Sequence, residues 1–313
     1  MNEELTLLSP PHLYPEGYPR HFTIKTITAE LRLETIGAEN LDQFIVDEIF
    51  PKCVIPTDSQ TCDYKSLLLI DFHWICRALH IVSWGATHFV NAIACTGGEN
   101  NFGCKDSDEM GRVFGDHRVS LSNIGFRQPP ANCEKILEIK AADTFIDWKW
   151  DLSIRFPRVG DMLHARKDPT FRAIAVKKAK GEGYIDPWDD LIVQFAYAIT
   201  HCNKKAVEDR RELYTGLAAM NDLDFDGLLT AYNKTFGGYG IEMSGTVPCP
   251  KCGAEARFYA PVEERFLRPS LREKRLRREE LIKAKKSKQP LTDSDVNTNR
   301  LADAGEESEA VAV

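Results

Sequence analysis

The sequence lacks the long apolar run and the leader expected of a membrane or exported protein. Its most apolar helical candidate, Leu67 to Val82, spans about 16 residues and contains Asp71, His73, Arg77 and His80. A membrane-spanning helix needs about 20 predominantly apolar residues, so this stretch predicts a buried helix instead. The N-terminus has acidic residues and prolines where a signal peptide has a basic start and an apolar run. We therefore expect the protein to stay in the cytoplasm.

Familiar catalytic motifs are also missing. There is no Walker loop, GxGxxG, GxSxG or HExxH motif, and no cysteine and histidine stand in a recognisable nucleophile setting. The acid cluster Asp186, Asp189 and Asp190 surrounds Pro187. A helix that starts here would use these acids as its cap and at the positive end of its dipole. We therefore expect no enzymatic activity.

A second acidic stretch resembles half of a calcium loop, because it places Asp222, Asp224 and Asp226 at alternate positions. A complete loop ends in a bidentate glutamate at its twelfth position, where this sequence has Asn233. We expect these aspartates to cap a helix and not to bind calcium.

Charge is distributed unevenly along the chain. The net charge of −7 gives no support to general nucleic-acid binding. Residues 271–290 hold nine basic residues against three acidic ones, about +6, and predict a very polar helix. Residues 291–313 hold six acidic residues against Arg300, about −5, and have the composition of a disordered tail.

Nine cysteines in a chain without an export signal argue against a disulfide framework, because the cytosol keeps thiols reduced. Five have no paired spacing and are expected to be small buried hydrophobes: Cys53, Cys62, Cys76, Cys133 and Cys202. The other four are candidate metal ligands: Cys95, Cys104, Cys249 and Cys252.

The stretch Cys249-Pro-Lys-Cys252-Gly253 has the form of a zinc knuckle. In such a turn both thiolates point at one metal, and the glycine permits a tight backbone path. The best partners are Cys95 and Cys104, because both lie at the end of a predicted strand in a glycine-rich loop. Four protein ligands leave no open coordination position, so the sequence predicts a structural zinc site.

Other interpretations of these residues stay open. His88 or His117 could replace one ligand, or all four thiols could be reduced and purely structural. A redox role for the CxxC pair is disfavoured, because such a pair normally begins a helix and this one lies between predicted strands. His73 and His80 share a polar stripe of the buried helix, but no carboxylate or cysteine joins them at helical spacing, so we expect no ligand role.

The pattern of helix and strand signals predicts an α+β protein with a mainly helical body, an inserted small antiparallel β region and a zinc-knuckle-like β-hairpin. We divide the chain into six parts: an extended N-terminal arm at 1–22, an N-terminal helical part at 23–85, a β-rich insert at 86–159, a C-terminal helical part at 160–240, a CxxC knuckle hairpin at 241–270 and a charged, disordered tail at 271–313.

Capping residues set the expected helix limits in the N-terminal half. Thr28 is expected to cap a short helix, and a second helix from Leu41 to Ile49 is expected to end at Pro51. Ser66 is expected to cap the buried helix and Gly85 to stop it.

Several stretches taken together resemble one family, the baseplate hub subunits and hub assembly chaperones of contractile-tailed bacteriophages of the T-even type. They are the proline-rich N-terminus with residues 22–28, residues 42–53, and the Leu-rich helix that ends in Trp84-Gly85 before a cysteine-bearing strand. Residues 155–161 and the closing CPKCG knuckle with residues 266–270 complete the match, which covers most of residues 5–270. Family members often show a second close CxxC, whereas Cys95 and Cys104 are eight intervening residues apart here.

The resemblance implies a non-enzymatic protein that acts through protein–protein contacts in virion assembly. Its implied partners are other baseplate hub or tail proteins of the phage. Its implied location is the cytoplasm of the infected bacterial host during assembly, or the tail baseplate of the virion. No small-molecule substrate and no membrane is expected, and nucleic acid is disfavoured as a partner.

The alternative is a zinc-ribbon nucleic-acid-binding or regulatory protein that uses residues 272–288 to hold phosphates. That segment lacks interleaved aromatic residues, and Glu273, Glu279 and Glu280 favour salt bridges on a helix surface. In the phage interpretation, residues 1–22 and 266–290 are expected to order on partner hub subunits.

Overall fold

The computed structural model describes residues 2–35, 38, 40–58, 61–98, 103–169, 196–237, 239–241, 244–260 and 278–279. Met1–Arg268 form one compact unit and Pro269–Val313 a second. The helix start predicted at Asp186 and all of the charged tail except Arg278 and Glu279 lie outside the described residues. Within the described part of the chain, no helix is long and apolar enough to cross a bilayer.

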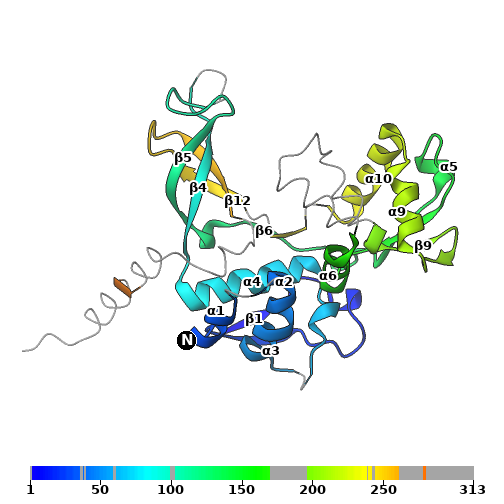
Figure 1. Cartoon of the computed structure of the whole chain (residues 1–313), viewed down its shortest axis with the longest axis horizontal. Coiled ribbons are helices and arrows are strands. Elements are labelled where there is room, and N and C mark those ends of the chain that lie inside the picture. Colours follow the sequence, from blue (N-terminus) through cyan, green and yellow to red (C-terminus); the bar gives the residue numbers. More distant parts are fainter. Residues whose placement is uncertain are drawn as a thin grey trace, which may run out of the picture. The chain divides into compact units, whose positions relative to one another are not determined.

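The N-terminal residues form a small sheet. Strands β1 (Asn2–Thr6), β2 (His21–Lys25) and β3 (Val54–Pro56) pair antiparallel in the order β1-β2-β3 (Figure 1). Leu5, Leu7, Leu13 and Tyr14 are buried in the same hydrophobic core as the central helix. The expected extended arm at 1–22 is instead a packed part of the fold, because burial of these apolar side chains and pairing of β1 with β2 stabilise it.

Two short helical elements flank β2 in sequence. The 3-10 turn η1 (Pro11–Leu13) lies between β1 and β2. Helix α1 (Ala29–Glu34) follows β2, and the side chain of Thr28 accepts a hydrogen bond from the backbone amide of Leu31. The predicted cap at Thr28 is therefore confirmed.

The second predicted helix continues past Pro51. It runs as α2 (Leu41–Phe44), the π-helical turn η3 (Ile45–Ile49) and α3 (Phe50–Cys53). Proline has no amide donor, and its ring crowds the carbonyl four residues earlier in an α-helix. Pro51 stands at the second position of α3, and proline is tolerated in the first turn of a helix, where its missing amide would have no partner. The helix therefore ends at Cys53 and not at the proline.

Helix α4 (Leu69–Trp84) lies at the centre of the core, as predicted. It ends at Gly85, whose φ of 91° is rarely adopted by L residues. Ser66 does not cap it, because Ser66 belongs to the 3-10 turn η4 (Tyr64–Ser66) and donates its hydroxyl hydrogen to Asp63.

A buried carboxylate joins the N-terminal segment to α4. Oδ1 of Asp71 accepts hydrogen bonds from the backbone amides of Leu8 at 2.7 Å and Ser9 at 3.3 Å. Oδ2 accepts from the hydroxyl of Tyr14, which itself accepts from the amide of Leu68 at 3.1 Å. Burial raises the pKa of Asp71, and the hydrogen bonds oppose that rise. Polar groups at the start of α4 thus fix the path of the chain around Tyr14.

Two strands of the predicted insert at 86–159 form one four-stranded sheet with the two strands of the knuckle hairpin. β4 (Thr87–Cys95) and β5 (Arg112–Ser120) form a long antiparallel hairpin. β12 (Ser244–Pro248) and β13 (Glu255–Tyr259) form the knuckle hairpin at the predicted place. The strand order is β12-β13-β4-β5, with Ala256 of β13 opposite Cys95 of β4.

Two further antiparallel sheets also combine distant strands. The first has the order β10-β9-β8-β7 and consists of β7 (Ile136–Ile139), β8 (Leu152–Arg155), β9 (Ile199–Cys202) and β10 (Lys205–Ala206). The second pairs β6 (Phe126–Arg127) with β11 (Gly240–Ile241). The 3-10 turn η6 (Leu121–Asn123) connects β5 to β6.

The expectation of a mainly helical body is wrong. The described residues form three antiparallel sheets of three or four strands and one two-stranded pair, so the protein is α+β with several sheets. Residues 86–159 do not make a separate β region, because their strands are divided among different sheets that also contain strands from 199–206, 240–241 and 244–259. Local alternation marks a strand without identifying its partner, which is why the sequence suggested one small insert.

Four further described helices follow β7 in the sequence: α5 (Ala141–Thr144), α6 (Val159–Lys167), α9 (Arg210–Ala218) and α10 (Asp222–Thr235). Helix α6 begins at the predicted Gly160-Asp161 position within one residue, and the carboxylate of Asp161 accepts from the amide of Arg158 at 2.8 Å. Asn221 caps α10 by accepting from the amide of Asp224 at 2.8 Å.

Asp224 is a second buried carboxylate that holds a distant loop. Its oxygens accept hydrogen bonds from the consecutive backbone amides of Ile146, Asp147 and Trp148, and from the side chain of Asn221. Burial raises the pKa of Asp224, but the bonds from the three amides outweigh burial, and the pKa lies below its usual value. Asn221, and not one of the three aspartates, is thus the helix cap, and Asp224 anchors the loop.

Replacing Tyr14 with phenylalanine should destabilise the protein by about 1.5–3 kcal/mol, because Oδ2 of Asp71 and the amide of Leu68 both lose a buried partner. Urea denaturation of the full chain measures the loss. Tyr259→Phe is the matched control, since the Tyr259 side chain is exposed, and it should change stability by less than about 0.5 kcal/mol. Equal stability of the two variants would contradict the anchoring role of Tyr14.

Asp224 should make stability depend on pH in the acid range. A carboxyl whose folded pKa is lowered contributes stability that is present above its unfolded pKa, about 3.9, and is lost as the pH falls through the folded pKa. Asp224→Asn should therefore be less stable than the native protein at pH 7, and the difference should shrink on acidification below about pH 4. Denaturation at several pH values tests this, with the exposed Asp222→Asn as control; a difference independent of pH would refute it.

Candidate metal centre

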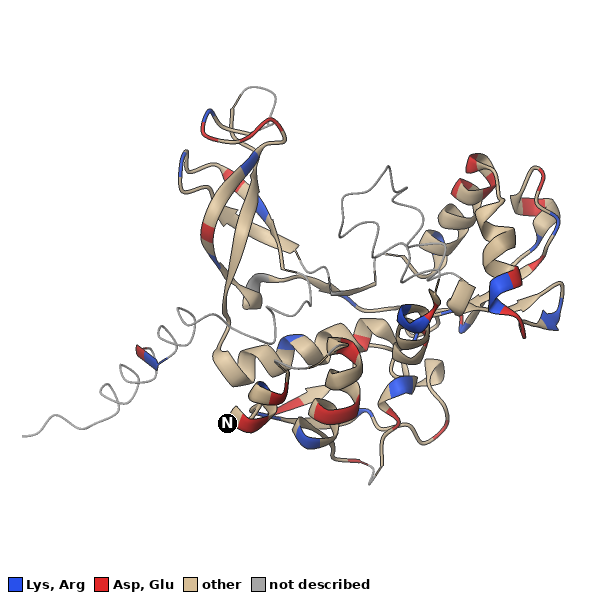
Figure 2. Ribbon diagram, in the orientation of Figure 1, with Lys and Arg blue, Asp and Glu red and all other residues tan. Residues whose placement is uncertain are grey.

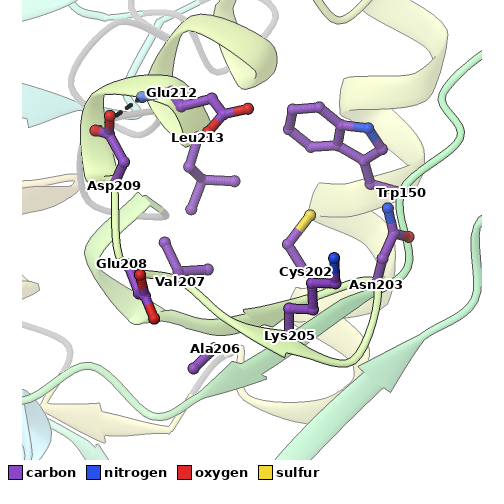
Figure 3. Close-up of a pocket in the computed structure, with 10 residues that line it drawn as sticks. All are labelled: Trp150, Cys202, Asn203, Lys205, Ala206, Val207, Glu208, Asp209, Glu212 and Leu213. Atoms are coloured by element: carbon purple, nitrogen blue, oxygen red, sulfur yellow. Dashed lines mark hydrogen bonds between the residues drawn. The ribbon is translucent and has the colours of Figure 1, made fainter.

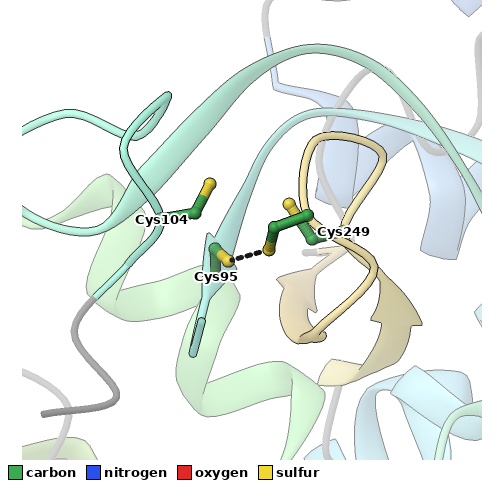
Figure 4. A group of neighbouring side chains, drawn as sticks. Cys95, Cys104 and Cys249 are labelled. Atoms are coloured by element: carbon green, nitrogen blue, oxygen red, sulfur yellow. Dashed lines mark hydrogen bonds between the residues drawn. The ribbon is translucent and has the colours of Figure 1, made fainter. Parts of the chain in front are cut away.

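The structure brings together all four cysteines that the sequence singles out. The Sγ atoms of Cys95, Cys104, Cys249 and Cys252 all lie within 4.8 Å of one another. Figure 4 shows this group of side chains, with Cys95, Cys104 and Cys249 labelled. The Sγ atoms of Cys95 and Cys252 are 3.5 Å apart. Four sulfurs at 2.3 Å from a tetrahedral ion would be about 3.8 Å apart. All four cysteines are free thiols, so the cluster could hold a metal ion.

Sheet pairing positions three of the four thiols. Cys95 is the last residue of β4, and Cys249 and Cys252 lie in the turn between β12 and β13. Because β13 pairs with β4, with Ala256 opposite Cys95, the turn comes to lie beside the end of β4. The amide and hydroxyl of Thr96 both donate to the carbonyl of Glu255, which extends this pairing by one residue.

The knuckle turn is closed by its own backbone. The amide of Cys249 donates to the carbonyl of Ala254 at 2.7 Å, and the amide of Gly253 donates to the carbonyl of Cys249 at 2.8 Å. Gly253 has a φ of 77°, a conformation that a residue with a Cβ rarely adopts. The tight turn that the sequence pattern predicts therefore forms, and both of its cysteines lie on the side of Cys95.

The loop after β4 makes close contacts with the Sγ atoms of the cluster. The amide of Gly97 donates to Sγ of Cys95 at 3.2 Å. A Cβ at position 97 would lie 2.8 Å from Sγ of Cys252, so only glycine fits between the two halves of the cluster. Ser107 follows Cys104 and donates from both its amide and its hydroxyl to the Cys104 carbonyl, which holds the fourth thiol in place. Gly97 was not identified from the sequence as part of the site, because the spacing of Cys95 and Cys104 does not indicate it.

Electrostatics favour a cation at this place. Burial raises the pKa of Cys249, but hydrogen bonds from the backbone amides of Lys251 and Cys252 outweigh burial. The pKa of Cys249 therefore lies below its usual value. The amide of Ala254 lowers the pKa of Cys252, but the neighbouring thiols outweigh this and raise it, since thiolates side by side repel each other. A divalent cation removes that repulsion and deprotonates all of its thiol ligands.

The histidines considered from the sequence lie outside the cluster. Among the described residues the four-cysteine cluster is the one group found that could hold a metal ion, and it contains no histidine. His88 packs against His80 with ring centroids 5.2 Å apart, and a ring nitrogen of His117 lies 2.8 Å from the Val113 carbonyl oxygen. Burial and the charge of Arg166 lower the pKa of His73 to about 4, so its ring is neutral at pH 7.

A hollow with a volume of about 780 Å³ lies away from the four cysteines. It is lined by Trp150, Cys202, Asn203, Lys205, Ala206, Val207, Glu208, Asp209, Glu212 and Leu213 (Figure 3). Two of its polar groups already have structural partners, since Asp209 caps α9 and Asn203 accepts from the amide of Asp151. Burial and the charges of Glu212 and Asp151 raise the pKa of Cys202, which disfavours a reactive thiolate.

Comparisons with known proteins add no relative. No protein-family model, curated protein or solved structure matches this chain. Functional inference therefore depends on the geometry of the described residues and on the resemblance carried by the sequence segments.

Loss of one thiol should weaken the cluster as a metal site. Cys249→Ser and Cys252→Ser should each reduce the metal bound per chain and lower the melting temperature by more than about 5 °C, because a four-ligand site becomes a three-ligand site. Metal analysis of the purified protein and thermal denaturation measure the two effects. Cys133→Ser, outside the cluster, should change neither. Unchanged metal stoichiometry in both knuckle variants would remove the metal assignment.

Proposed function

We propose that this protein is a non-enzymatic baseplate hub protein or hub assembly chaperone of a contractile-tailed bacteriophage, and that it acts through protein–protein contacts during virion assembly. The observation that carries the proposal is the meeting of two distant segments of the resemblance. The CPKCG knuckle lies against the cysteine-bearing strand that follows the Leu-rich helix α4. Segments that resemble one family in sequence order thus form one local structure.

We also propose that the cluster binds zinc as a structural ion. Four thiolates in a tetrahedral set suit zinc or an iron–sulfur centre. The sulfur–sulfur contact of 3.5 Å between Cys95 and Cys252 is close to the value expected around a single zinc ion, about 3.8 Å. With four protein ligands the ion has no open position for a substrate, so its role is to hold β4 and the knuckle hairpin together.

The proposed partners are other hub or tail proteins of the phage, met in the cytoplasm of the infected host. The packed N-terminal segment changes how such contacts can form. Leu5, Leu7 and Tyr14 are buried within this chain, so the described residues 2–22 are packed into the fold and do not form a free arm for a partner. Contacts with hub subunits are therefore proposed to use the surface of the folded protein.

Quantitative mass spectrometry of purified phage particles and of infected-cell lysate tests this function. The protein is counted against a known tail subunit in both samples. A fixed small copy number per particle is expected of a hub component, and abundance in lysate with none in particles is expected of a chaperone that leaves. A protein whose amount follows neither tail assembly nor particles would contradict the proposal.

A further inference from the structure

The outward face of the sheet β12-β13-β4-β5 carries a row of aromatic residues around an alanine. Phe114 of β5 pairs with Ala92 of β4. Phe258 of β13 pairs with Ile93, and the same antiparallel register places Tyr259 opposite Ala92 on its other side. The side chains of Tyr259 and Phe114 are 66% and 62% exposed. Adjacent strands are about 4.8 Å apart, so the two aromatic residues stand roughly 10 Å apart with only a methyl group between them.

A row of arginines lies beside the aromatic row. Ala94 pairs with Arg257 on one side and with Arg112 on the other. Arg112 forms an ion pair with Asp108 at 2.8 Å, and its guanidinium lies 5.2 Å from the ring centroid of Phe114. Arg257 is exposed and has no ion-pair partner among the described residues. The face therefore places the small residue Ala92 between two exposed aromatic residues, next to a guanidinium that forms no ion pair among the described residues.

The spacing of the two rows matches an extended peptide. Residues two apart in a strand are about 6.6 Å apart and point to the same side. A partner segment in extended conformation can therefore place one side chain over Ala92 and the side chain two residues away over Ala94. The first must be apolar to be buried between the rings, and the second must be a carboxylate to pair with Arg257. Tyrosine and arginine are also the residue types that dominate binding energy at protein interfaces.

We propose that this face docks an extended segment of a partner protein in which an apolar residue and an acidic residue stand two positions apart. This inference rests on the proposed function, because that function makes the partner a protein. Aromatic and arginine side chains on a sheet also suit single-stranded nucleic acid. The charges favour a protein, because Asp108 pairs with Arg112, Glu255 lies on the same strand as Arg257, and the chain carries −7 overall. Figure 2 shows both acidic and basic residues on the β4–β5 hairpin. Of the arginines in this row, only Arg257 has no ion-pair partner among the described residues, so a nucleic acid could pair few of its phosphates here.

Selection of a displayed library of random heptapeptides on the full-length protein tests the proposal. Enrichment of an apolar residue and Asp or Glu two positions apart is expected. A synthetic peptide of the enriched sequence should bind Tyr259→Ala and Arg257→Glu at least roughly tenfold more weakly than the native protein. The matched controls are Leu223→Ala and Arg211→Glu, an exposed apolar and an exposed basic residue outside this sheet, and they should bind within about twofold of the native protein.

Other results would overturn the proposal. Peptides that bind all five proteins equally, or enrichment of no such motif, would show that the face is no docking site for this kind of segment. Tighter binding of a labelled single-stranded oligonucleotide that is lost in Tyr259→Ala would assign the face to nucleic acid. Thermal denaturation confirms that each variant is folded, and two independent variants keep the test valid if one is not. Because the selection uses purified protein alone, its outcome is independent of the particle counts that test the hub function.

Discussion

The antiparallel pairing of β13 with β4 is the contact on which both ends of the four-stranded sheet depend. At the end of β4 it brings the turn with Cys249 and Cys252 to Cys95, and no other pairing of the described strands would do so. Its inward side buries Ile93 against Phe258. Its outward side leaves Ala92 and Ala94 between larger residues of the flanking strands, so one register determines the metal cluster, part of the core and the exposed rows.

Two buried carboxylates organise the rest of the described chain. Asp71 binds the amides of Leu8 and Ser9, and Asp224 binds the amides of residues 146–148. Burying a charge is costly, and several charge-assisted hydrogen bonds from backbone amides offset much of that cost. These amides belong to irregular segments, so they have no acceptor from a neighbouring strand or helix turn. The carboxylate oxygens accept their hydrogen bonds instead. Both carboxylates thus add polar anchors between loops and helices to the apolar packing of the core.

Local signals in the sequence located the helix α4, the knuckle hairpin and the four cysteines, because apolar periodicity, Gly85 and the CxxC spacing each act over a few residues. Long-range partners were beyond such signals. The strand pairings that divide residues 86–159 among different sheets could not be read from alternation alone. Asp71 looked like one polar residue on an apolar helix, and nothing nearby indicated that its partners are backbone amides 60 residues earlier. The packed N-terminus was missed for the same reason.

The separation of the two halves of the cysteine cluster along the chain also matters during synthesis. Cys104 leaves the ribosome about 145 residues before Cys249. At 5–20 residues per second this interval is on the order of ten seconds. During it β4 lacks the strand β13 that pairs with it in the folded protein, and Cys95 and Cys104 lack the two thiols that complete the cluster. An unpaired strand edge can pair with other chains, so the synthesis of β13 supplies the partner that covers this edge.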